Sequence, residues 1–350
     1  MNVTEQACLR KLNTFGVPAR AALLIEVESE EEVLALPALR PDRDLVLGGG
    51  SNVLFVSDVP GTVVLNRIRG IDVIERTDEH VFVEVGAGEN WHDLVMHATD
   101  QGWHGLENLA LIPGLAGAAP IQNIGAYGVE LASVLDSVTA WDREQAQWAV
   151  LATHECRLGY RDSRFKAKPE RFLITSIRLR LQRRFEPQIG YAGLGEALRA
   201  AGAGDHPTAS QVRDAVIGLR RRKLPDPALE GNAGSFFKNP VVPPDTAEGL
   251  RRDHADLPGW PQPDGRIKLP AAWLIEHCGL KGETTGGAAV SDRHALVLVN
   301  RHQATGRDVW ALARRVIARV EERYGIHLEP EPRIFGHRTG ADEPSGQDAA

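Results

Sequence analysis

The sequence predicts an α+β fold, because strand-like and helix-like stretches both occur but do not alternate strictly along the chain. Stretches 44–49, 61–66 and 81–88 are rich in hydrophobic and β-branched residues and are bounded by glycine or charged turns, which is typical of strands. Stretch 174–182 alternates apolar and polar residues, as a half-buried strand does. Helical spacing places four apolar residues on one face between these strands: Trp91, Leu94, Val95 and Ala98.

Two helices and a short strand are predicted in the second half of the chain. Thr208 and Gln211 can form a capping box before an apolar stripe, and the prolines that follow the stripe end this helix. Another helix begins after 305–308, and stretch 294–300 is typical of a short buried strand. The polar, glycine- and alanine-rich stretch 183–207 is the best candidate for a linker between domains.

The composition excludes several classes of function. The chain has 350 residues, a net charge of −7 at pH 7, a pI near 6.0 and no basic stripe, which argues against a nucleic-acid partner. No apolar run has the length of a signal peptide or a membrane span. The three cysteines are scattered and lack metal-ligand spacing, so we expect a cytoplasmic protein with no metal and no disulfide framework.

A first glycine-rich loop follows a strand-like run in LVLGGGSNVLF (45–55). Consecutive backbone N–H groups in such a turn can bind an anion, and glycine lets a pyrophosphate approach closely. A tight β-turn with no ligand would explain the same residues. The chain contains neither the G-x-G-x-x-G nor the G-x-x-x-x-G-K-[ST] motif, so a nucleotide here requires another fold. The candidate cofactor residues of this loop are Gly48, Gly49, Gly50, Ser51 and Asn52.

A second loop, 109–130, is longer and consists mostly of small residues. Such a stretch makes a weak core, but it suits a wall where backbone lies against a large flat ligand. Together the two loops suggest a dinucleotide with an extended ring system, whereas a closely packed sheet–helix contact is the alternative. The candidate cofactor residues here are Pro113, Gly114, Gly117, Ala118, Gln122, Asn123, Gly125 and Ala126.

A third segment, GNAGSFFKNP (231–240), places Ser235 between flexible backbone and two phenylalanines. Taken alone, it is typical of a loop that leads into a strand, with Phe236 and Phe237 in the core. The functional alternative is that Ser235 lies where backbone can approach a ligand, with Lys238 and Asn239 close by.

Five segments together resemble the UDP-N-acetylenolpyruvoylglucosamine reductase family. They occur in the family's order over nearly the whole chain, and although each is only moderately specific, the ordered set is very specific. The segments are LGGGSNVLF, IPGLAGAAPIQNIGAYG, CRLGYRDSRFK, GNAGSFFKNP and LEPEPRIFG. A further segment, QIGYAGLGEAL (188–198), resembles the extra loop of the larger subtype, although the family's usual Asp after Tyr-Gly is absent here.

The resemblance implies a UDP-N-acetylmuramate dehydrogenase of peptidoglycan synthesis, in which NADPH reduces a non-covalently bound FAD. The reduced flavin then converts UDP-N-acetyl-enolpyruvoylglucosamine to UDP-N-acetylmuramate. The resemblance further implies an FAD-binding region of the vanillyl-alcohol-oxidase type in two subdomains, 1–66 and 67–200, and a C-terminal α+β substrate-binding domain, 205–336. We expect a disordered tail at 337–350 and a monomer whose partners are the sugar nucleotide and NADPH, with no nucleic acid or membrane.

The catalytic residues that the resemblance implies are Arg161, Ser235 and Glu331. Arg161 would hold the substrate carboxylate in a bidentate fork, although a surface ion pair with Asp162 would explain an arginine there equally well. Ser235 matches the proton donor. Glu331 matches the glutamate that assists the intermediate or the proton supply, with Glu329 as an alternative only two residues away.

Substrate-binding positions also follow from the resemblance. Lys223 and Asn239 match residues that bind the diphosphate, and Tyr191 matches the tyrosine that closes over it. Tyr160 is the fourth substrate-binding candidate, whereas Lys238 is expected to be only a solvated charge. The rival interpretations are another FAD-dependent oxidase of the same fold and a nucleotide-binding protein without catalysis.

Overall fold

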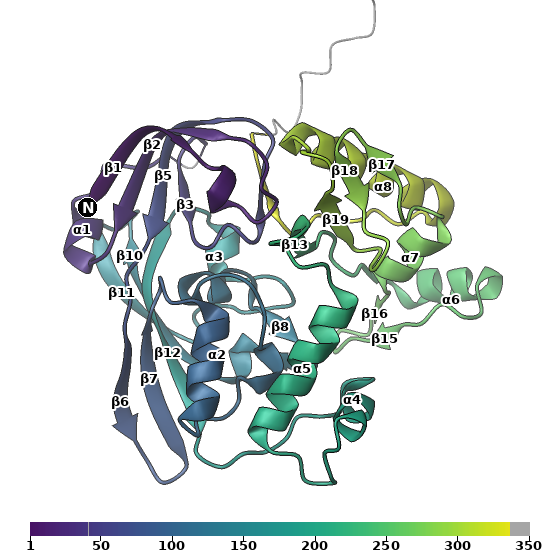
Figure 1. Cartoon of the computed structure of the whole chain (residues 1–350), viewed down its shortest axis with the longest axis horizontal. Coiled ribbons are helices and arrows are strands. Elements are labelled where there is room, and N and C mark those ends of the chain that lie inside the picture. The colour runs from purple at the N-terminus through teal and green to yellow at the C-terminus, as the bar shows by residue number, and fades with distance from the viewer. Residues whose placement is uncertain (41, 337–350) are drawn as a thin grey trace, which may run out of the picture.

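The computed structural model describes residues 1–40 and 42–336, and the tail predicted at 337–350 lies outside the described residues. The three largest sheets among the described residues have four, five and four strands, and helices accompany each of them (Figure 1). The long helix α5 (Ala209–Lys223) runs between the N-terminal half and the C-terminal part of the molecule in Figure 1.

The first sheet has the strand order β1-β2-β5-β3, in which β2, β5 and β3 are parallel and β1 pairs with β2 in the antiparallel sense. Its strands are β1 (Asn2–Cys8), β2 (Arg20–Val27), β3 (Leu45–Leu47) and β5 (Val59–Asn66). The short helix α1 (Glu30–Leu34) begins where the Ser29 side chain accepts a hydrogen bond from the backbone of Glu32. Stretches 44–49 and 61–66 therefore contain the predicted strands.

The second sheet is antiparallel throughout, with the strand order β11-β10-β12-β7-β6. Its strands are β6 (Ile71–Arg76), β7 (His80–Gly86), β10 (Leu135–Asp142), β11 (Gln147–Ala152) and β12 (Phe172–Gln182). Helices α2 (Trp91–Asp100) and α3 (Arg164–Ala167) and a small hairpin, β8 (Gly125–Ala126) and β9 (Val129–Glu130), accompany this sheet. Short 3₁₀ helices span Arg10–Leu12, Glu107–Leu109, Ala116–Gln122 and Leu131–Ser133.

The third sheet belongs to the C-terminal part and has the strand order β13-β19-β18-β17. These strands are β13 (Gly231–Ser235), β17 (Thr284–Thr285), β18 (Ala288–Val290) and β19 (Val297–Asn300), all paired in the antiparallel sense. Helices α6 (Pro244–Asp253), α7 (Ala271–His277) and α8 (Gly306–Tyr324) lie with it, and a small sheet combines β14 (Val241–Val242), β15 (Trp260–Pro261) and β16 (Ile267–Lys268). The predicted capping boxes are present at Thr208–Gln211 and Thr305–Asp308.

The end of the described chain returns to the first sheet region. Strand β20 (Arg333–Phe335) pairs in parallel with β4 (Val53–Phe55), which directly follows the first glycine-rich loop. One hydrophobic core therefore contains side chains from residues 7–65 together with side chains from 233–335. Because of this return, the residues just before β20 lie beside the first glycine-rich loop.

Helix α5 buries its apolar stripe in the core of the second sheet. Val212, Val216 and Leu219 belong to the cluster that contains the strands of residues 81–181. Stretch 183–207, which we expected to be a linker, instead holds helix α4 (Leu194–Ala200), whose Leu194 and Leu198 are buried in that cluster. The sequence pattern did not reveal α4, because the helix is short and surrounded by glycine.

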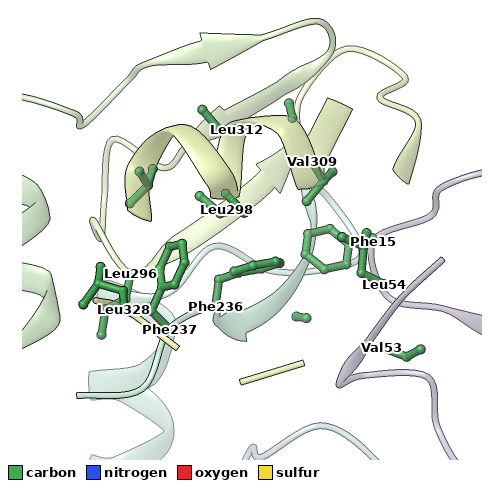
Figure 2. Packing of buried hydrophobic residues seen from close by; sticks show 14 of the residues in the cluster. Phe15, Val53, Leu54, Phe236, Phe237, Leu296, Leu298, Val309, Leu312 and Leu328 are labelled. Carbon is green, nitrogen blue, oxygen red and sulfur yellow. The ribbon is translucent and has the colours of Figure 1, made fainter. Parts of the chain in front are cut away.

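Phe236 and Phe237 lie fully inside the shared core, where the Phe236 ring meets the edge of Phe15 at 6.1 Å between centroids (Figure 2). Side chains of α8 and β19 cover the other side of the pair in Figure 2. The two phenylalanines directly follow Ser235, so their burial holds the end of β13 in place.

We predict that Phe236→Ala lowers the free energy of unfolding by about 3–5 kcal/mol, because it removes a fully buried ring and leaves a cavity. Leu229→Ala is the matched control, since Leu229 is 89% exposed and its truncation should change the stability by less than about 0.5 kcal/mol. Urea denaturation of the two variants measures both values, and equal stability would contradict the packing described here.

Candidate active site

The two glycine-rich loops contact each other directly. The Ser51 hydroxyl donates a hydrogen bond to the carbonyl of Pro113 at 3.1 Å, and a Cβ atom added to Gly49 would lie 3.0 Å from the Cα of Gly114. A Cβ on Gly48 would meet Ala118 at 3.3 Å, and one on Gly117 would overlap Ala87. Bulkier residues would therefore push the loops apart.

The first loop offers backbone donors that the described residues do not use. Among residues 1–40 and 42–336, no hydrogen bond is found for the N–H groups of residues 48–52, although Gly50 is buried and has φ 63°. Since buried backbone donors are normally paired, this run is suited to an anion such as a pyrophosphate. The loop thus fits the predicted phosphate-bearing cofactor.

Asn52 joins three segments that are far apart in the sequence. Its side-chain amide donates to Gln122 Oε1 at 2.6 Å and to the carbonyl of Glu331 at 3.3 Å, and its own carbonyl accepts from Arg333 N–H at 3.0 Å. The first loop, the second loop and the C-terminal segment are therefore tied together at one side chain.

Asn123 has a structural function in the second loop. Its side-chain amide donates both hydrogens, to Glu130 Oε2 at 2.7 Å and to the carbonyl of Gly159 at 3.2 Å, while Oδ1 accepts from the N–H of Ala132. The residue is also almost fully buried and has φ 45°. Both of its side-chain N–H groups therefore stabilise the second loop.

Arg161 and Glu331 form an ion pair near these loops, with 3.1 Å between Nε and Oε1. The guanidinium also donates to the carbonyl of Gly125 at 3.0 Å, and glycine is needed there because a Cβ would crowd Glu130 and Arg161. Arg161 has the left-handed φ of 53°, which is costly for a non-glycine residue. The Lys166 ammonium donates to the Arg161 carbonyl at 3.2 Å and helps to hold this conformation.

Burial raises the pKa of the Glu331 carboxyl above its ordinary value, while the cations of Arg161, Lys166 and Lys238 act in the opposite direction. Glu329 differs, because its side chain is 68% exposed and pairs with Lys238 at 2.9 Å, which lowers its pKa. Glu331 is therefore the better candidate for the catalytic carboxyl. Lys238 is an ion-pair partner and not the solvated charge that we expected.

Ser235 ends β13 beside the segment that carries Glu331. The Glu331 N–H donates to the carbonyl of Phe236 at 2.8 Å, and Phe237 and Pro330 form a β-bridge. Gly234 has φ 69°, and a Cβ there would meet no atom within 4 Å, so the backbone before Ser235 is open. The Ser235 hydroxyl, half-buried, makes no hydrogen bond within the described residues and is available to a ligand.

Tyr160 lies between two cations. The Arg161 guanidinium is 5.5 Å and the Lys268 ammonium 4.8 Å from the centre of its ring, and Asn239 lies close enough to influence its hydroxyl. Burial raises the Tyr160 pKa. The Asn239 carbonyl oxygen of the side chain also accepts from the N–H of Ala271, the first residue of α7. Two of the predicted substrate residues are thus in contact.

Tyr191 and Lys223 are the other two predicted substrate residues. Tyr191 is 45% exposed and its ring meets Tyr127 edge-on at 5.0 Å, so it reaches the second loop from the start of α4. Lys223 is the exposed last residue of α5, and in the described part of the chain no hydrogen bond or ion pair joins it to the other predicted residues. The structure brings Arg161, Ser235 and Glu331 together, whereas Lys223 makes no direct contact with them among the described residues.

Sequence reasoning assigned no function to Lys166 or Lys268. Lys166 lies in the segment CRLGYRDSRFK, but a lysine five residues after Arg161 gives no sign that its ammonium donates a hydrogen bond to the Arg161 carbonyl. Lys268 lies on a two-residue strand with no recognisable motif. Neither could be found without the three-dimensional structure.

Both parts of the chain match families of known proteins. Residues 226–335 match the C-terminal domain of UDP-N-acetylenolpyruvoylglucosamine reductase, and residues 21–146 match an FAD binding domain. The reductase of Chromobacterium violaceum is 50% identical over 332 residues, which cover 93% of this chain and 97% of the relative. That of Bordetella pertussis is 50% identical over 333 residues, 94% of each chain. The chain belongs to this family.

A solved structure supports the same assignment. The reductase (MurB) of Thermus caldophilus has a TM-score of 0.67 and 27% identity, covering 95% of this chain and 98% of that one. The predicted family, the FAD-binding region followed by a C-terminal reductase domain, and FAD as cofactor are thereby confirmed. Among the described residues of this family member, no helix is long and apolar enough to cross a membrane.

We predict that Gly117→Ala weakens the retention of FAD by this reductase, because the added methyl overlaps Ala87 and displaces the second loop. Gly204→Ala is the control, since a Cβ there would meet no atom within 4 Å and the backbone has no positive φ. The increase in flavin fluorescence after dilution measures how much FAD has dissociated from each variant. Equal flavin loss from both variants would mean that the second loop does not position the cofactor.

Proposed function

We propose that this chain reduces the enolpyruvyl double bond of UDP-N-acetyl-enolpyruvoylglucosamine to give UDP-N-acetylmuramate, with NADPH as the hydride donor. When bound, FAD supplies the hydride relay between NADPH and the terminal vinyl carbon of the substrate. The observation that carries the proposal is the half-buried Arg161–Glu331 pair beside Ser235 and the two glycine-rich loops. The family membership supports the same reaction.

Arg161 would bind the substrate carboxylate. Hydride addition to an enol ether conjugated with a carboxylate produces an enolate-like anion, whose charge must be stabilised by cations or hydrogen-bond donors. The guanidinium is planar and offers several donors, so it can hold both carboxylate oxygens. Its bond to the Gly125 carbonyl and the support from Lys166 orient it before the substrate arrives.

Ser235 would donate the proton to the carbon next to the carboxylate. A hydroxyl is a weak acid in water, but its free O–H beside an enolate in a closed site can give up its proton. Glu331 would assist by stabilising the intermediate or resupplying the proton, since burial lets its carboxyl stay protonated to higher pH than an exposed glutamate.

Tyr160, Tyr191, Lys223 and Asn239 would bind the sugar nucleotide. The proximity of Asn239 to the Tyr160 hydroxyl supports a common surface, and the partial exposure of Tyr191 lets it cover a bound diphosphate. Lys223 supplies a point charge from the end of α5.

We also propose that the enzyme works as a cytoplasmic monomer, which neither the fold nor the family membership decides. The three cysteines are free, as expected in a reducing compartment. Arg161, Ser235 and Glu331 all come from one chain, so no second copy is needed to complete the site.

We expect Ser235→Ala to leave flavin reduction by NADPH nearly intact and to slow reoxidation by the substrate by about 10²–10⁴-fold, since a positioned acid is lost. Ser235→Cys should retain more activity because a thiol still donates a proton. Stopped-flow absorbance in the flavin band separates the two half-reactions. Reoxidation of Ser235→Ala at the wild-type rate would exclude Ser235 as the proton donor.

A pH profile tests Glu331. Because its pKa is raised, the substrate half-reaction should slow as the pH rises through that pKa, and Glu331→Gln should remove this dependence while lowering the rate. Lys166→Met deletes a cation that lowers the Glu331 pKa, so the same decline should move to higher pH. An unchanged profile in Glu331→Gln would assign the pH dependence to another group.

A further inference from the structure

Arg220 lies in the last turn of α5 and has no partner for its charge. Its Nε is shielded from solvent and makes no hydrogen bond, and within residues 1–40 and 42–336 no carboxylate forms an ion pair with its guanidinium. The residue as a whole is only half-buried, so a ligand can reach the rest of the side chain. A shielded cation without a counter-ion is costly unless a ligand supplies the missing charge.

Another shielded arginine of the same helix is paired. Arg213, two turns earlier on α5, contacts Asp100 at 3.0 Å and Asp214 at 2.9 Å. Arg178, on β12, also has a shielded Nε without a hydrogen bond, and its guanidinium lies 6.0 Å from the centre of the Phe82 ring. Arg220 therefore differs from Arg213 on its own helix, because it lacks a carboxylate partner.

The groups around Arg220 increase this imbalance. Arg161 carries the same charge and lies within electrostatic reach, while Tyr127 is neutral, because burial raises its pKa further. Burial lowers the Arg220 pKa, and Arg161 acts in the same direction. Tyr127 in turn contacts Tyr191 edge-on. The surroundings of Arg220 thus include a second cation, Arg161, and the neutral Tyr127, which contacts Tyr191.

We propose that Arg220 binds the pyrophosphate of the nucleotide ligand, which rests on the proposed function and adds a residue to its binding site. Arg220 precedes Lys223 by three residues, so both cations project from neighbouring positions on the last turn of α5. A guanidinium matches two phosphate oxygens at once, and the Lys223 ammonium adds a point charge. A carboxylate is the less suitable ligand, since Arg161 already offers its fork for one.

The test uses the FAD-loaded enzyme with inorganic pyrophosphate as the probe, and compares Arg220→Met, Arg220→Lys and the exposed neighbour control Arg221→Met. Titration calorimetry should show pyrophosphate binding weakened at least about tenfold in Arg220→Met, to a smaller extent in Arg220→Lys, and unchanged in Arg221→Met. Without ligand, the Tm of Arg220→Met should be equal to or above that of the wild type, because an unpaired shielded charge has been removed.

A structural arginine would behave in the opposite way. Unchanged pyrophosphate affinity in Arg220→Met, or no pyrophosphate binding by the wild type, overturns the proposal. If Arg220→Met has a lower Tm than the wild type, the Arg220→Lys variant decides between the two explanations. Weaker pyrophosphate binding by Arg220→Lys at the wild-type Tm supports the proposal, and unchanged pyrophosphate binding overturns it. Pyrophosphate binding needs no turnover, so a wild type that binds it without reducing the enolpyruvyl substrate would refute the proposed function and leave this site standing.

Discussion

The return of the C-terminal segment to the first glycine-rich loop is the constraint on which the site depends. Strand β20 pairs with β4, and the preceding residues pair with the end of β13, so Glu331 is held from two sides. Asn52 adds a third attachment through the Glu331 carbonyl. Without these contacts, the buried carboxyl would have no reason to lie opposite Arg161, and Ser235 would end a strand with no acidic neighbour.

The site carries more positive than negative charge, which suits substrate binding better than it suits the stability of the free protein. Glu331 is a single, largely shielded carboxyl with three cations near it, and Arg161 adopts a backbone conformation that non-glycine residues avoid. Breaking a buried ion pair is costly because the remaining charge is left unpaired. A substrate that brings its own carboxylate supplies a new partner to Arg161, so the excess of positive charge is suited to the bound state.

The sequence predicted the elements whose signals are local. The capping boxes at Thr208 and Thr305, the strand at 174–182 and the buried Phe236–Phe237 pair each follow from a few adjacent residues. Signals that arise only from long-range contacts were missed. No local pattern shows that the Asn123 amide donates to Glu130 and to the Gly159 carbonyl, or that the Lys166 ammonium reaches the Arg161 carbonyl. The C-terminal parts of the site could be placed only through the resemblance, because no local pattern shows that β20 pairs with β4.

The shared core has a consequence for how the chain is made. Side chains of residues 7–65 are buried together with side chains of 233–335, whereas the core of the second sheet is formed from one continuous stretch, 81–219. During synthesis on the ribosome, the middle stretch can therefore fold as soon as it emerges, while the first sheet waits for the last part of the chain. Closing so long a loop is entropically costly and slow. We expect a nascent chain arrested before β19 to have a protease-resistant middle and an exposed N-terminus that is a ready target for chaperones.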